Sequence, residues 1–129
     1  MAAESRPDDL SILDTDRLFR RVSPNQLVAQ PDGTHRPSSA VFKNAELSVN
    51  IESLMKEQGR PPEDSLDGYP GDFLTAVLAG RIREFGLPIV KDTAPPNDPA
   101  HGLVLGKKTG SFANAMVRFH QWIVSPEKT

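Results

Sequence analysis

Residues 97–111, NDPAHGLVLGKKTGS, hold the side chains whose spacing comes nearest to a phosphate-binding loop. A nucleotide-binding loop has four residues between its two glycines, then lysine and serine or threonine. Here Gly102 and Gly106 enclose only three residues, all apolar, and Lys107 is followed by a second lysine. The count argues against a nucleotide loop and favours a strand for the apolar residues.

His101 opens this expected strand, directly after a proline-stiffened loop that contains Asp98. A histidine in that position could act as acid, base or hydrogen-bond donor, with Asp98 orienting its ring. The structural alternative is a histidine that closes the strand end by bonding to the loop backbone. We therefore take His101 and Asp98 as the candidate catalytic residues and leave both interpretations open.

Basic and hydroxyl side chains suggest a second kind of chemistry, the binding of a carboxylate or phosphate. Arginines concentrate in the first third of the chain, and the run GTHRPSS puts serines beside one of them. The lysine pair at 107–108 precedes an expected helix, whose first amide groups could help to hold an anionic group. The candidate anion-binding residues are Arg20, Arg21, Arg36, Ser38, Ser39, Lys107 and Lys108.

Each of these residues also has a structural explanation. Arginines on an edge strand discourage aggregation, hairpin serines bond to nearby backbone, and a lysine pair at a strand end is ordinarily solvated. A serine close to a histidine in sequence is weak support for a nucleophile, because catalytic triads are assembled from distant elements.

The composition excludes several classes of site. The chain has no cysteine, which rules out disulfides, thiolate metal sites and a cysteine nucleophile. Its histidines, His35, His101 and His120, are scattered and lack the spacing of metal ligands, so we expect neither a metal nor a cofactor. The net charge of -2 provides no general attraction to nucleic acid or to an anionic membrane.

The N-terminal run MAAESRPDDL shows no signal peptide. The longest mostly apolar run, FLTAVLAG, is far shorter than the ~20 residues that span a bilayer. We therefore expect a cytoplasmic protein without nucleic-acid or membrane partners.

The elements that must position the candidate residues follow from the hydrophobic pattern. RLFRRV, residues 17–22, alternates as a strand does, and QPDGT then predicts a tight turn and a hairpin. Apolar residues at helical spacing predict helices over 73–85 and 111–124, the second capped by Ser111. LPIVKD and HGLVLG, between these helices, predict two strands.

Strands in the first half and a helix–strand–strand–helix order in the second indicate a small single α+β domain. We expect an N-terminal hairpin and two main helices packed on a mixed sheet. Residues 16–125 form this domain, after a flexible segment at 1–15 and before a tail at 126–129.

The runs LFRR, RPSSAVFKNAELSV and DPAHGLVLG resemble the LxRR, RPSSxxF…LSV and DPAHxxVxG blocks of a family of small, functionally uncharacterised bacterial proteins. The resemblance extends over residues 18–124 and implies a bacterial protein, but it brings no activity with it. The positions that match the family pattern are Arg20, Arg21, Arg36, Pro37, Ser38, Ser39, Ser48, Asp98, Pro99 and His101.

A more distant resemblance is to ADP-ribosyltransferases, in which an arginine- or histidine-bearing first strand is followed by a serine-bearing one. LFRRV and then RPSSAVF or ELSV follow the same order. Those enzymes use a late catalytic glutamate near a strand. The only glutamate after Glu84 is Glu127, which falls in the expected tail.

The leading functional hypothesis is a non-catalytic binding or accessory module that acts with a partner protein, since the sequence shows no complete catalytic constellation. The alternative is a small enzyme or ligand-binding protein that uses His101 and the arginine and serine cluster on an anionic substrate. An ADP-ribosyltransferase-like activity is the most distant form of that alternative. The alternative predicts that one concave pocket is lined by His101, Arg20 or Arg21, Arg36 and Ser38 or Ser39, whereas the leading hypothesis predicts that these residues scatter.

Overall fold

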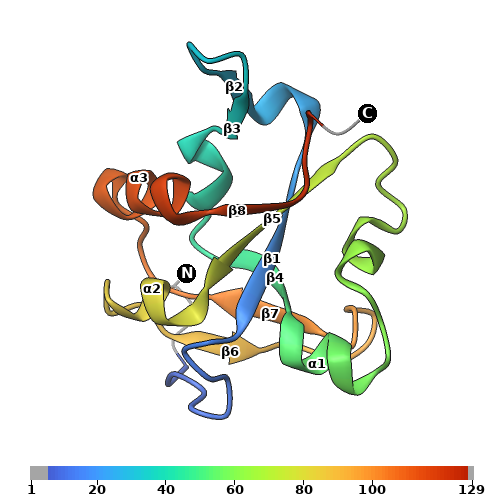
Figure 1. The fold of residues 1–129 in the computed structure, drawn as a ribbon. Coiled ribbons are helices and arrows are strands. Elements are labelled where there is room, and N and C mark those ends of the chain that lie inside the picture. The colour runs from blue at the N-terminus through green and yellow to red at the C-terminus, as the bar shows by residue number, and fades with distance from the viewer. Residues whose placement is uncertain (1–5, 128–129) are drawn as a thin grey trace.

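Six strands pair into one antiparallel sheet in the order β6-β7-β4-β1-β5-β8, and two more strands form a separate hairpin (Figure 1). The computed structural model describes residues 6–127. The sheet strands are β1 (Arg17–Val22), β4 (Leu47–Ile51), β5 (Phe73–Leu78), β6 (Ile89–Lys91), β7 (His101–Val104) and β8 (Gln121–Val124). The hairpin strands are β2 (Leu27–Ala29) and β3 (His35–Pro37). The helices are α1 (Glu52–Glu57), α2 (Ala79–Arg83) and α3 (Gly110–Phe119), with 3-10 turns η1 (Pro24–Gln26), η2 (Ser39–Phe42) and η3 (Pro62–Leu66).

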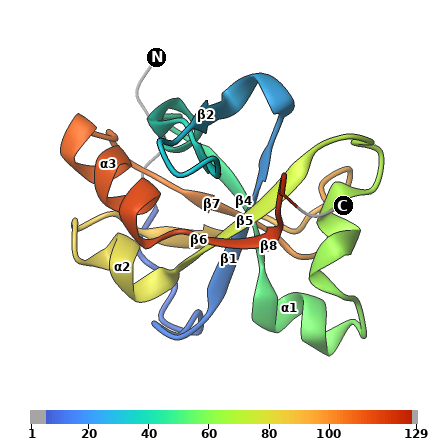
Figure 2. The same cartoon turned by 45° about the horizontal axis from the view of Figure 1, so that its top comes forward.

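The two faces of the sheet are covered by different elements. Leu18 and Val22 of β1 face the larger core, where side chains of η2, α2 and α3 pack. Phe19 points to the other face, where Met55 of α1 and Leu66 of η3 cover a smaller core. Figures 1 and 2 show α2 and α3 on one side of the sheet and α1 on the other. The alternation of β1 therefore sends its side chains into two different environments.

The fold confirms the predicted α+β class, the strand at residues 17–22 and the hairpin at QPDGT. Several details of the prediction are wrong. The sheet was expected to be mixed, but all of its strand pairs are antiparallel. Parallel neighbours would require a crossover connection, usually a helix, between them.

The predicted helix over 73–85 is also wrong, because its first half is β5 and only residues 79–83 are helical. β5 lies between β1 and β8, so Leu74, Thr75, Ala76 and Val77 are all buried. A strand covered on both faces carries a continuous apolar run, and such a run also satisfies helical spacing.

The predicted helix over 111–124 ends early, at Phe119, and the chain continues as strand β8. His120 is extended, with φ -62° and ψ 155°, and β8 pairs with the outer edge of β5. The helix is capped by the hydroxyl of Thr109, which accepts from the Phe112 amide at 3.1 Å, and not by Ser111.

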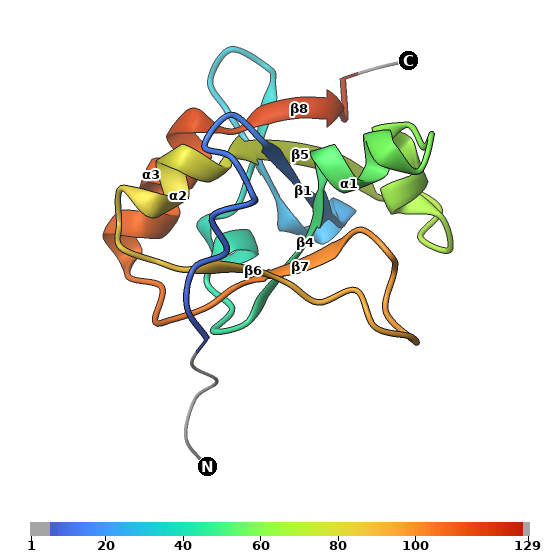
Figure 3. The same ribbon diagram turned by 90° about the horizontal axis from the view of Figure 1, so that it is seen from below.

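The N-terminal segment runs across β6, as Figure 3 shows. The Asp9 amide donates to Ile89 O at 2.8 Å, and the Asp8 carboxylate accepts from the Ile89 amide at 2.9 Å. Ile12 is fully buried in the larger core. Of the segment that we expected to be flexible, residues 6–15 therefore make specific contacts, while residues 1–5 lie outside the described part of the chain.

The expected tail at 126–129 is described as far as Glu127, whose carboxylate contacts His35 Nδ1 at 2.9 Å. No helix within residues 6–127 has the length and the apolar character needed to cross a bilayer.

Candidate functional site

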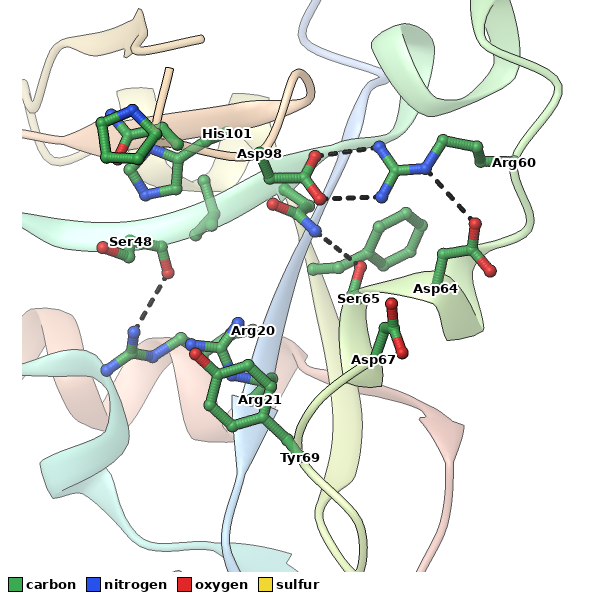
Figure 4. A pocket seen from close by; sticks show the side chains of 15 residues that line it. Arg20, Arg21, Ser48, Arg60, Asp64, Ser65, Asp67, Tyr69, Asp98 and His101 are labelled. Atoms are coloured by element: carbon green, nitrogen blue, oxygen red, sulfur yellow. Dashed lines mark hydrogen bonds and ion pairs between the residues drawn. The ribbon is translucent and has the colours of Figure 1, made fainter. Parts of the chain in front are cut away.

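A pocket of about 520 Å³ opens on the face of the sheet that carries α1 and η3 (Figure 4). Strands β1, β4 and β7 supply its floor. Its walls come from residues 60–69 on one side and from the loop at 96–98 on the other.

The floor follows from the register of the three strands. Phe19 of β1 pairs with Asn50 of β4, and Asn50 pairs with His101 of β7. Directly paired residues share a face, and residues two positions away point the same way, so Arg21 and Ser48 lie on this face too. Side chains from distant parts of the sequence therefore meet in one pocket.

His101 is oriented by Asp92. Its Nδ1 lies 3.1 Å from the Asp92 carbonyl oxygen and 3.2 Å from the Asp92 carboxylate. With Nδ1 donating to these oxygens, Nε2 carries the lone pair of the neutral ring. The prediction that Asp98 orients the ring is wrong, because only the backbone carbonyl of Asp98 reaches His101, at its amide.

The carboxylate of Asp98 instead binds Arg60. Arg60 donates two parallel hydrogen bonds to it, at 2.9 and 2.7 Å, and a third to Asp64 at 3.3 Å. The Arg60 hydrogen bonds lower the pKa of Asp98, and the same bonds raise the pKa of Arg60. This ion pair joins the two walls of the pocket.

Arg20 and Arg21 both line the pocket but differ in what they contact. The Arg20 guanidinium donates to Val41 O and Ser48 O, each at 3.1 Å, and burial lowers its pKa. The Arg21 guanidinium lies 3.8 Å from the centroid of the Tyr69 ring. Within residues 6–127, no hydrogen bond or ion pair engages it.

Arg36, Ser38 and Ser39 do not line this pocket. Arg36 lies on the hairpin, donates to Pro37 O at 3.1 Å and borders a separate hollow beside α3. Ser38 caps η2 by accepting from the Ala40 amide at 3.2 Å, and Ser39 is the first residue of that turn. Ser38 therefore bonds to nearby backbone, which is the structural explanation that the sequence also allowed for it.

The lysine pair lies at a third place. Lys108 is buried, and its ammonium donates to the carbonyl oxygens of Ala45, Val104 and Gly106 at 2.7, 2.5 and 2.7 Å. An ammonium has three donors, so none remains for an anion. Burial lowers the pKa of Lys108 to about 8. Lys107 is exposed next to it.

The sequence interpretation missed Asp92, Arg60, Tyr69 and Asn50. The sequence placed Asp92 at the end of a predicted strand, but only the pairing of Lys91 of β6 with Gly102 of β7 puts it beside His101. The contacts of Arg60 and Tyr69 come from a loop whose course no local pattern predicts.

Glu127, the glutamate that an ADP-ribosyltransferase-like site would need, contacts His35 and does not line the pocket. In the described residues, no three histidine, aspartate or glutamate side chains are grouped so that they could hold a metal ion.

No protein-family model matches the chain, and neither the curated proteins nor the solved structures include a significant match.

Proposed function

We propose that this protein binds a small polar molecule through an anionic group, and that the pocket on the α1 face of the sheet is its binding site. The observation that carries the proposal is the Arg21 guanidinium, stacked on Tyr69 without a hydrogen-bond partner among residues 6–127. It shares the pocket with His101 and Ser48.

Stacking on an aromatic ring holds the plane of a guanidinium while its N–H groups stay available. Two parallel N–H groups then match a carboxylate or a phosphate. The other charged groups of the pocket are less available, because Arg60 is bound by Asp98 and Asp64 and Arg20 by backbone carbonyls. Arg21 is therefore the side chain best suited to bind an incoming anion.

The remaining donors and acceptors suit a polar ligand. With its Nδ1 held by Asp92, a neutral His101 ring presents Nε2 as an acceptor, and the Ser48 hydroxyl makes no hydrogen bond to any described residue. The volume of about 520 Å³ lies within the range of small-molecule sites. These features support ligand binding beside His101 and Arg21, whereas Arg36, Ser38 and Ser39, which the same hypothesis placed in this pocket, lie outside it.

A thermal-shift screen of carboxylates and phosphate monoesters tests the proposal. We expect at least one anion to raise the Tm of the wild-type protein, by about 5 °C at tenfold excess over its Kd. Arg21→Ala should weaken that anion at least tenfold, since a charge-assisted bidentate contact is lost.

Arg118→Ala is the matched control, because Arg118 is exposed on α3 and does not line the pocket. Its affinity for the same anion should equal that of the wild type. Equal affinities for wild type and Arg21→Ala would contradict the proposal.

A second candidate function, the binding of a partner protein, is favoured by the outer edge of β8. β8 is the last strand of the sheet, and no backbone group within residues 6–127 pairs with its free side. The opposite edge, β6, is occupied by the N-terminal segment through Asp8 and Asp9. An unpaired edge accepts an added strand.

The partner would present an extended segment to β8. Affinity capture from lysate with the wild-type chain and with Gln121→Lys tests this candidate, because a lysine on an edge strand opposes strand addition. A protein captured by the wild type should be lost with the variant. Capture that is identical with both chains would refute the use of this edge.

A further inference from the structure

Carboxylates face the cations across the pocket. Asp64 belongs to η3, and Asp67 is the first residue after the end of η3. Figure 4 shows both on one side of the pocket, with His101 and Ser48 on the other. The site therefore has an acidic wall as well as a basic floor.

One carboxylate of the acidic wall has no partner among residues 6–127. Asp64 and Asp98 are both held by Arg60. The side chain of Asp67 is exposed, and no ion pair or hydrogen bond from residues 6–127 engages its oxygens. Arg21 and Asp67 are thus a cation and an anion of the same pocket that are paired neither with each other nor with another described side chain.

One short turn positions Asp67 and Tyr69, the residue whose ring lies under the Arg21 guanidinium. The Asp67 amide donates to Asp64 O at 3.1 Å, and the Tyr69 amide donates to Leu66 O at 2.9 Å. Gly68 lies between them with φ +83°, a left-handed conformation that favours glycine. The turn presents the Asp67 carboxylate and, two residues later, the ring on which Arg21 stacks.

We infer that the ligand of this pocket is a small zwitterion, with an anionic group on Arg21 and a positively charged amino group on Asp67. This inference rests on the proposed anion-binding function. A purely anionic ligand would leave Asp67 unpaired and would be repelled by its charge, whereas an ammonium group converts that repulsion into a charge-assisted hydrogen bond. Asp67 then selects among anions that Arg21 alone would accept.

Matched pairs of probes test this selection by NMR titration of the full chain. β-Alanine, 4-aminobutyrate and 6-aminohexanoate are each compared with propionate, butyrate and hexanoate, which lack only the amino group. We expect at least one zwitterion to bind about tenfold more tightly than its matched carboxylate. Asp67→Asn should remove that preference and leave the affinity for the plain carboxylate equal or higher.

Glu63→Gln is the control, because Glu63 is an exposed carboxylate of η3 that does not line the pocket. It should keep the preference for the zwitterion. The inference is overturned if every zwitterion binds like its matched carboxylate, or if Asp67→Asn keeps the preference. Arg21-dependent binding of carboxylates without such a preference would overturn this inference alone, whereas a lack of any Arg21-dependent binding would overturn the proposed function as well.

Discussion

Lys108 and Arg21 show two different uses of a cation in this chain. Lys108 has all three donors on backbone carbonyls, so it joins the loop at Ala45 to the end of β7. Arg21 has its guanidinium over Tyr69, and no residue from 6 to 127 accepts a hydrogen bond from its N–H groups. Both residues were candidate anion ligands from the sequence, because residue type shows what a side chain can bind. It does not show which partner already occupies it.

Lys108→Met should lower the free energy of unfolding by about 3 kcal/mol, because it leaves three carbonyl oxygens without their donor. Lys107→Met, at the exposed neighbouring position, should change it by no more than about 0.5 kcal/mol. Urea unfolding of both variants measures the difference. Equal stabilities would show that the Lys108 bonds do not contribute to the fold.

At the scale of elements, the pocket depends on the close approach of β4, β6 and β7. A Cβ added at Gly102 would lie 2.7 Å from Ile51 Cδ1 and 3.0 Å from Val90 O, so a larger residue fits between these strands only if these neighbours shift. The sequence predicted the strand of Gly102 from its apolar residues, but not its neighbours. The helix predicted over 73–85 was wrong for a related reason. A strand buried on both faces shows no alternation of apolar and polar residues that would distinguish it from a helix.

Gly102→Ala should destabilise the protein by about 2 kcal/mol, because the Ile51 side chain and the backbone at Val90 must shift to accommodate the methyl group. Gly110→Ala is the matched substitution, at the first residue of α3, where an added Cβ meets open space. It should be neutral or slightly stabilising, since alanine favours helices. Chemical denaturation compares the two, and a Gly102→Ala protein as stable as Gly110→Ala would contradict the packing described for β7.

At the scale of the whole molecule, buried and ion-paired groups link the stability of the fold to pH. Burial lowers the pKa of His120 from its ordinary 6.5. Hydrogen bonds from Arg17 and Arg60 lower the pKa of Glu52 and Asp98 respectively. In each case the unfolded chain takes up a proton at higher pH than the folded chain does, so acidification favours unfolding.

The free energy of unfolding should therefore fall in two stages. It first decreases as the pH drops below 6.5, the ordinary pKa of His120, and again below about 4.5, the ordinary pKa of Glu52. His120→Asn should remove the first stage and keep the second. Urea unfolding between pH 7 and pH 3 checks both stages, and an unchanged slope above pH 5 in the variant would refute the assignment to His120.

The α+β class could be predicted from the sequence because alternation and turn residues are local signals, and β1 and the hairpin followed from them. The pocket could be predicted only in part. His101 and Arg21 were chosen for their types, but the strand register that unites them is set by long-range pairing. The walls come from loops, whose courses are fixed by contacts such as the Arg60–Asp98 ion pair.

The measurement that tests the central claim most directly is an NMR titration of the assigned full chain with a small carboxylate such as butyrate. If the pocket is the binding site, the largest amide shift changes should cluster at Arg21, Ser48, Tyr69 and His101. They should disappear in Arg21→Ala. Shift changes centred instead on Arg36 and Arg118, or unchanged by Arg21→Ala, would contradict the account.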